Sequence, residues 1–337
     1  MNGTRIREPG IDLLRCLGLL FVNGVHGFLY NGFYYEPQSG AAMAAADGFR
    51  WLFFCCNGLF LLITGYLKSA KPFGRGYYRS LAPILVGYVL SCAVSFPIRQ
   101  FLLGDRMSLA GWLEKLFGFG NYGWYIGMYV GLFLLSPFLN LVLDRLTTPG
   151  QLLWLAGTMA AVTALPSATP LPLMPSHWTA MYPATYYVLG AVIRRLQPKL
   201  RPVWCLLAAA ATAALLTLLT MLSTDGTFGD GFGQGYGGFW VTVMAVWIFL
   251  ALYRLPVPQR AARCLAWMSG GVMEGYLLSR LLDVWVYDLF PGWHRPGGYP
   301  LLFLCCTVPI FCCSLLAGKA VHTLAAALCR RLPCRKC

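Results

Sequence analysis

The stretch "IDLLRCLGLLFVNGVHGF", residues 11–28, decides the fold class, because it is long and apolar enough to form a membrane-spanning helix. It nevertheless contains Asp12, Arg15 and His26. An ionisable side chain at the bilayer centre costs about 2.5–3.5 kcal/mol on insertion scales, so such side chains usually face a protein interior or a wet cavity and mark function. Charges and length also argue against a cleaved signal peptide. The stretch therefore predicts a retained membrane helix with a functional polar face.

The rest of the chain has the composition of a polytopic membrane protein. Of 337 residues, 58% are hydrophobic and only 11% are charged. No stretch of ordinary polar composition is long enough to fold as a separate soluble domain. We therefore expect a single transmembrane domain over residues 1–337, an all-α bundle of about ten helices. Apolar runs place these helices near residues 11–30, 49–67, 80–98, 124–143, 152–170, 181–193, 203–222, 238–253, 265–287 and 300–322.

The distribution of basic residues predicts the orientation of this bundle. With a cytoplasmic N-terminus, nineteen Lys and Arg fall in inner segments and four, Arg99, Arg106, Lys115 and Arg295, in outer ones. The positive-inside rule then predicts that both termini are cytoplasmic, including a short basic tail at about 323–337, and that segments 31–48 and 223–237 lie outside. Basic loops facing anionic membrane lipid also account for the net charge of +14, so no nucleic-acid partner is expected.

The cysteines predict neither a disulfide framework nor a metal site. Ten of the thirteen lie within or at the ends of apolar spans, where a thiol packs as a small hydrophobic group. The tail sequence "CRKC", residues 334–337, has metal-like spacing. It has no second such pair and no nearby histidine, which favours reduced cytoplasmic thiols over a metal centre.

In the first helix, the polar residues share one face. Arg15 and His26 are eleven positions apart, so at 100° per residue they fall within about 20° of each other, roughly 16 Å apart along the axis. Asp12 and Asn23 lie on the same stripe. A purely structural alternative is that Asp12 neutralises Arg15 and that His26 is a buried imidazole bonded to a neighbouring carbonyl group.

Four segments, in order along the chain, resemble the membrane acyltransferase-3 family. The first helix of that family has an Arg or Lys, then a His after ten intervening residues, and commonly an Asp three residues before the Arg; Arg15, His26 and Asp12 match. The four segments are "GIDLLRCLGLLFVNGVH" (10–26), "GLFLLITGYLKSAKPFGRGYYRSLAPILVGY" (58–88), "NYGWYIGMYVGLFLLSPFLN" (121–140) and "YVLGAVIRR" (187–195).

The resemblance implies a multi-pass plasma-membrane O-acyltransferase. Such an enzyme takes an acetyl or short acyl group from cytoplasmic acyl-CoA and delivers it to a hydroxyl of a glycan or lipid-linked sugar at the outer side. Acyl-CoA would be a substrate, so no tightly bound cofactor is expected, and a homo-oligomer is compatible with this interpretation. His26 would be the general base, since imidazole titrates near the working pH. Asn23, one turn below, would orient it, and Asp12 would position Arg15.

The resemblance also suggests where the donor and acceptor bind. Arg75 and Arg79 would hold the CoA phosphates, because guanidinium groups bind phosphate in a bidentate manner. Arg15 would then contact the pantetheine arm. The alternative for Arg75 and Arg79 is ordinary positive-inside charge. Trp124 and Tyr125 are either a sugar platform or part of the interfacial aromatic belt.

The ninth span, "MEGYLLSRLLDVW", carries Glu274, Arg280 and Asp283. Arg280 and Asp283 can pair at a spacing of three, so Glu274 is expected to face a cavity or a partner helix, and Glu274 and Arg280 are candidate substrate-binding residues. Many family members carry a histidine here, where this chain has Ser279 and Arg280. Intramembrane charges are also typical of transporters. A transporter or flippase of a small molecule or lipid-linked sugar is therefore the main alternative, followed by a non-catalytic assembly or sensing protein.

Overall fold

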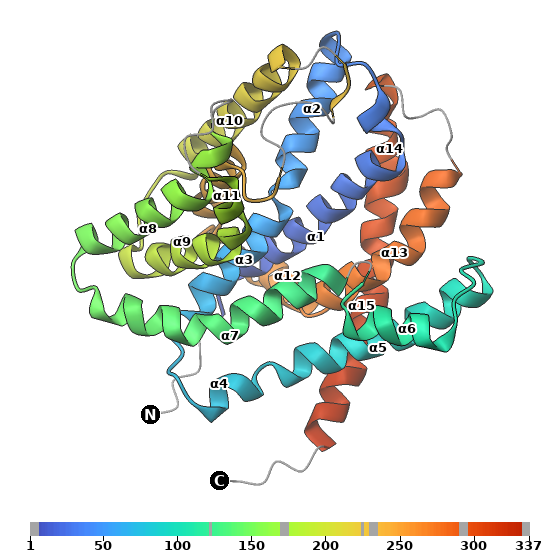
Figure 1. Ribbon diagram of the computed structural model, residues 1–337, viewed down its shortest axis with the longest axis horizontal. Coiled ribbons are helices and arrows are strands. Elements are labelled where there is room, and N and C mark those ends of the chain that lie inside the picture. Colours follow the sequence, from blue (N-terminus) through green and yellow to red (C-terminus); the bar gives the residue numbers. More distant parts are fainter. Residues whose placement is uncertain are drawn as a thin grey trace.

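The structure is a computed structural model that describes residues 7–120, 123–168, 175–223, 226–228, 235–289 and 296–331. Its first helix, α1 (Pro9–Tyr30), lies in the interior of the bundle (Figure 1). Most residues of α1 are buried, including Asp12, Asn23 and His26. It begins with a proline at its first position, where a missing N–H costs no hydrogen bond. Burial on nearly every face explains why the polar stripe of α1 must find partners within the protein.

The other helices surround α1, with α8–α11 on one side and α13–α15 on the other (Figure 1). The described residues form no strand, only an isolated bridge between Pro37 and Thr227. The longer helices are α2 (Ala41–Phe54), α3 (Cys56–Lys68), α5 (Ala82–Phe101), α7 (Trp124–Arg145), α8 (Pro149–Thr163), α9 (Tyr182–Leu196), α10 (Pro202–Ser223), α11 (Phe239–Leu252), α12 (Gln259–Ser269), α13 (Val272–Asp288) and α15 (Val308–Arg331). Shorter α-helices are α4 (Arg75–Arg79), α6 (Leu109–Phe117) and α14 (Tyr299–Leu302), and a π-helical turn, Phe303–Thr307, joins α14 to α15.

The structure confirms an all-helical protein with membrane-length helices. Within the described ranges, six stretches are long and apolar enough to cross a membrane: Pro9–Tyr30, Ala41–Lys68, Arg75–Phe101, Trp124–Arg145, Pro202–Ser223 and Tyr299–Arg330. The other four predicted spans correspond to the shorter helices α8, α9, α11 and the α12–α13 pair. The number of ten crossings and the cytoplasmic position of both termini stay predictions.

Two of the expected segments differ from the helices that form. The second span starts at Ala41, not near residue 49, because Ala41–Phe54 is helical and packs on α1 and α10. Much of the segment 31–48 is thus helix and not loop. The ninth span, expected as one helix over 265–287, is broken at Gly270 and Gly271 into α12 and α13.

Small residues bring α13 against α15. A Cβ atom on Gly271 would lie 2.6 Å from the backbone nitrogen of Lys319, and one on Gly318 would collide with the backbone of Gly275. Glycines permit such close approach of membrane helices, as small residues do in other helix pairs within bilayers. The contact holds the first turn of α13, with Glu274, beside α15.

Candidate functional site

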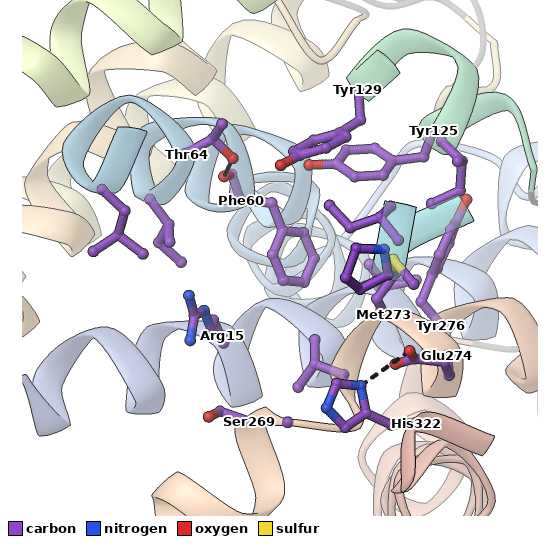
Figure 2. A pocket seen from close by; sticks show the side chains of 18 of the residues that line it. Arg15, Phe60, Thr64, Tyr125, Tyr129, Ser269, Met273, Glu274, Tyr276 and His322 are labelled. Atoms are coloured by element: carbon purple, nitrogen blue, oxygen red, sulfur yellow. Dashed lines mark hydrogen bonds and ion pairs between the residues drawn. The ribbon is translucent and has the colours of Figure 1, made fainter. Parts of the chain in front are cut away.

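A cavity of about 350 Å³ lies between α1, α3, α7, α13 and α15 (Figure 2). Its ionisable lining residues are Arg15, Lys68, Glu274 and His322, together with the phenols of Tyr125, Tyr129 and Tyr276. Most of the remaining wall is apolar, with Phe60 and Met273 pointing inward. A largely apolar cavity with a few convergent polar groups is typical of a binding site for a small molecule or cofactor.

A second large cavity, of about 390 Å³, lies elsewhere along α1 and has a different character. It is lined by Gly24 and Gly27 of α1, by Phe49 and Phe53 of α2, and by the segment from Tyr299 to Thr307. No charged side chain lines it, within the residues that the structure describes. Gly24 lies about 160° around α1 from His26, so this cavity is on the other face of the helix. The cavity that carries Arg15 is therefore the candidate functional site.

Asp12 anchors the N-terminal end of α1, and Arg15 rests against it. The Asp12 carboxylate is buried and accepts hydrogen bonds from Arg15 Nη1 at 3.2 Å, Arg7 Nε at 2.5 Å and Ser269 Oγ at 2.7 Å. The hydrogen bond to Asp12 raises the pKa of Arg7, which precedes the helix. The expected contact between Asp12 and Arg15 is present, and Arg7 and Ser269 add two partners that the sequence did not predict. Asp12 thus holds Arg15 at the cavity wall.

Asp283 is the partner of His26. His26 Nδ1 lies 2.8 Å from Asp283 Oδ2, and both side chains are buried. The prediction that Asn23 orients His26 is wrong, because both amide atoms of Asn23 are buried with no hydrogen-bond partner among the described residues. A carboxylate on a neighbouring helix attracts an imidazole more strongly than a neutral amide one turn away can. A His–Asp pair results that joins α1 to α13.

The His26–Asp283 pair lies just beyond one end of the cavity. On α1, Val22 lines the cavity and His26 is four residues, about 6 Å, farther along the axis. On α13, Tyr276 lines the cavity and Asp283 is seven residues farther on the same face. The rings of Tyr276 and Tyr125, both of which line the cavity, stand edge to face with their centroids 5.9 Å apart. Arg15 therefore lines the cavity near one end, and His26 lies just beyond the opposite end.

Glu274 lines this cavity, as expected of a charge that faces away from lipid. It is 2% exposed, and its Oε1 lies 3.1 Å from Nδ1 of His322 on α15 (Figure 2). His322 also lines the cavity and is partly exposed. The sequence did not predict His322 as a functional residue. A carboxylate paired with an imidazole thus forms part of the wall at the start of α13.

Arg280 contacts Tyr30, which in turn packs against His26. Its Nη1 donates a hydrogen bond to the hydroxyl of Tyr30, and its guanidinium carbon lies 5.2 Å from the centre of the Tyr30 ring. That ring stands edge-on to the imidazole of His26, with centroids 6.0 Å apart. Arg280 also lines a small cavity with Arg99 and Ser91. Arg280 and Tyr30 thus lie on the side of His26 away from Arg15.

The remaining predicted residues are only partly at the site. Tyr125 lines the cavity, whereas Trp124 does not and stacks on Tyr236 with a centroid separation of 5.8 Å. Arg75 and Arg79 are exposed on α4, outside the cavity lining. The basic residue from this region that does line the cavity is Lys68, whose Nζ donates to Ser80 Oγ at 3.1 Å. A donor-binding role for Arg75 and Arg79 therefore stays a prediction.

Sequence reasoning identified Asp283 but not its contact with His26, and it missed His322, Lys68 and Tyr276. The available signal was the rule that intramembrane charges find partners across helices. That rule gives no means of choosing which helix supplies the partner.

No group of three or more His, Cys, Asp or Glu that could hold a metal occurs in the described part of the chain, and Cys334 and Cys337 lie outside it.

Comparison with known families identifies the family of this chain. A model of the acyltransferase-3 family, described as an acyltransferase domain, matches residues 8–319. No curated protein and no solved structure matches the chain. The match covers nearly the whole chain, including every residue of the cavity named above except His322. The chain therefore belongs to the acyltransferase-3 family of membrane acyltransferases, and neither transport nor a non-catalytic role gains support.

Proposed function

We propose that this acyltransferase is an O-acyltransferase of the plasma membrane, with His26 as its general base. It would move an acetyl or other short acyl group from cytoplasmic acyl-CoA to a hydroxyl of a glycan or lipid-linked sugar. The observation that carries the proposal is the His26–Asp283 contact of 2.8 Å at the end of a cavity whose wall also bears Arg15. A base at one end and cationic groups along the wall are what transfer from an anionic thioester requires.

The contact between His26 and Asp283 supports a separate role for each ring nitrogen. A carboxylate beside Nδ1 stabilises the tautomer in which Nδ1 carries the proton, so Nε2 is the basic nitrogen. Nε2 would remove the proton of the acceptor hydroxyl as its oxygen attacks the thioester carbonyl carbon. The positive charge that then develops on the imidazole would be stabilised by Asp283. General-base catalysis of this kind contributes about 10²–10⁴ in rate.

The donor would occupy the cavity from its cationic wall to its His26 end. Arg15 and Lys68 present a guanidinium and an ammonium group to it, and both attract phosphate. The aromatic and aliphatic wall suits the less polar pantetheine arm. The reacting thioester would then lie near Val22 and Tyr276, within about one helical turn of His26. Arg75 and Arg79, at the surface, would add charge for the nucleotide end.

The acceptor would approach His26 from the opposite side, past Tyr30 and Arg280. Both are partly exposed, and they supply a phenol and a guanidinium for hydrogen bonds to hydroxyl or anionic groups of a sugar. This arrangement lets the donor and acceptor reach one base from two sides.

The direct test is incubation of the purified protein with radiolabelled acetyl-CoA and candidate glycans or lipid-linked sugars. Label should pass to the acceptor with the wild type and not with His26→Ala. Equal transfer of label by the wild type and by a His26→Ala protein that binds acetyl-CoA would overturn the role of His26. Absence of transfer to every hydroxyl acceptor, with transfer to an amine, would overturn O-acylation.

A further inference from the structure

Asn57, in the first turn of α3, is a buried polar residue at the His26 end of the donor cavity. It is 4% exposed and lines the cavity together with Val22, Tyr125 and Tyr276. Its side-chain Nδ2 is buried and has no hydrogen-bond partner among the described residues. An amide N–H₂ group left unsatisfied in a mostly apolar wall is unfavourable. Such a group is explained if a ligand supplies the acceptor atom.

The packing of α1 against α3 fixes the depth of Asn57. A Cβ atom on Gly18 would meet the ring of Phe60 on α3 at 2.8 Å, and one on Gly24 would collide with the ring of Phe53 near the end of α2. Since α2 and α3 form one membrane-length stretch, Ala41–Lys68, this stretch runs in the opposite direction to α1, and Asn57, between Phe53 and Phe60, lies level with the part of α1 just before Val22. His26 is four residues beyond Val22, about 6 Å along the axis. The amide is thus about as deep as the place assigned above to the thioester.

We infer that Asn57 is a further catalytic residue, whose Nδ2 donates a hydrogen bond to the carbonyl oxygen of the bound thioester. This inference rests on the proposed function. The acceptor oxygen forms a bond to the carbonyl carbon, its proton passes to His26 Nε2, and the carbonyl oxygen becomes an anion. When that anion collapses, the carbon–sulfur bond breaks, and the thiolate of CoA takes the proton from His26.

Asn57 stabilises the oxyanion of this intermediate. A preorganised donor in a water-poor site is worth more than in water, and loss of one such donor typically lowers kcat by about 10²–10³. Near this depth Val22 and Ile126 are aliphatic, and the other hydrogen-bond donors of the wall are the phenols of Tyr125 and Tyr276. The cationic residues Arg15 and Lys68 lie along other parts of the same wall and serve the phosphates.

The test compares Asn57→Leu with the wild type and with Thr217→Ala. Leucine has a similar size and no donor. The Thr217 hydroxyl on α10 is likewise buried without a partner among the described residues, but it lines neither the donor cavity nor the small cavity with Arg280. Asn57→Leu should lower kcat by about 10²–10³, with the Kd of acetyl-CoA changed less than about twofold and with an equal or higher unfolding temperature. Thr217→Ala should keep the wild-type kcat.

An Asn57→Leu enzyme with wild-type kcat overturns the inference, as does a loss of activity that is matched by an equal rise in Kd. Where Asn57→Leu does not fold, Asn57→Gln takes its place, because it keeps the amide but displaces it and should lower kcat in the same direction. If the wild type transfers no acyl group, the proposed function fails. Normal His26-dependent transfer with an unaffected Asn57 variant means that only the present inference fails.

A spectroscopic signature separates a catalytic contact from a structural one. Acetyl-CoA labelled with ¹³C at the carbonyl is bound to His26→Ala, where transfer is blocked, and the infrared carbonyl band is recorded. A hydrogen bond from Asn57 should move the band to lower frequency than in the double variant Asn57→Leu/His26→Ala. Identical bands in the two proteins overturn the inference.

Discussion

His26 on α1 and Asp283 on α13 are 257 residues apart in the sequence and lie within hydrogen-bond distance, with Nδ1 and Oδ2 2.8 Å apart. The contact connects the first helix of the bundle to a helix near the end of the chain. It gives the imidazole a fixed orientation and a counter-charge, which are the properties that a general base requires.

Removal of the carboxylate charge at position 283 should therefore impair transfer. Asp283→Asn keeps the size of the side chain but allows the wrong tautomer of His26, so kcat should fall by about 10²–10⁴. Binding of acetyl-CoA, measured by calorimetry, should be unchanged. The control is Asp144→Asn, which removes an exposed carboxylate that pairs with Arg195. Equal activity of Asp283→Asn and the wild type would leave the contact without a catalytic role.

Changes at His26 itself should separate chemistry from structure. His26→Ala and His26→Asn should both lose about 10²–10⁴ in rate while the fold and donor binding are kept. Asparagine supplies a hydrogen-bonding group of smaller size but no base. The measurement is transfer of radiolabelled acetyl groups by detergent-purified protein with a monodisperse elution profile. A well-folded His26→Asn protein with near-normal transfer would return His26 to a structural role.

Arg15→Ala should weaken donor binding without unfolding the protein. Asp12 would keep its hydrogen bonds from Arg7 and Ser269, so no buried carboxylate is left unpaired and the loss of stability should be below about 1 kcal/mol. Titration with acetyl-CoA and thermal unfolding in detergent measure the two effects separately. Strong destabilisation with unchanged donor affinity would show that Arg15 serves only to neutralise Asp12.

The surface arginines Arg75 and Arg79 can be tested as a pair. Replacement of both by Gln should weaken binding of acyl-CoA if they contact its phosphates, and added salt should weaken the wild type in the same direction because the charges are exposed. Arg260→Gln/Arg263→Gln on the exposed start of α12 is a matched control for loss of two inner positive charges. Unchanged affinity for acyl-CoA in the Arg75/Arg79 double variant would mean that these residues serve only as positive-inside charge that sets the membrane orientation.

The predicted orientation can be tested by cysteine labelling. In a background without native cysteines, Ser39→Cys should react with an impermeant maleimide from outside the cell, and Lys199→Cys only after permeabilisation. Both positions are exposed, so failure to react would not come from burial. Reaction of Lys199→Cys in intact cells, with protection of Ser39→Cys, would reverse the orientation.

The sequence by itself determined the class of fold and one polar face. A long apolar segment is helical in a bilayer because its backbone N–H and C=O groups find hydrogen-bond partners there only within the helix. The period of 100° per residue then places Arg15 and His26 on one side of α1. The order of the motifs along the chain was enough to indicate the family. The rule that ionisable side chains in membrane helices face away from lipid was enough to predict that Glu274 faces a cavity or a partner helix. The sequence did not predict the break between α12 and α13, because the two glycines at the break pack against α15 through a tertiary contact.

Tertiary structure alone decided which polar groups meet across helices. Local spacing indicates only the neighbour of Asp283 three residues away, Arg280, whereas the packing of α13 on α1 brings Asp283 to His26, 257 residues away. The same holds for Glu274 with His322 and for the depth of Asn57. A periodic pattern specifies which face of a helix is polar, but the partner depends on how helices pack, which is set by glycine contacts and side-chain shape distributed over the whole bundle.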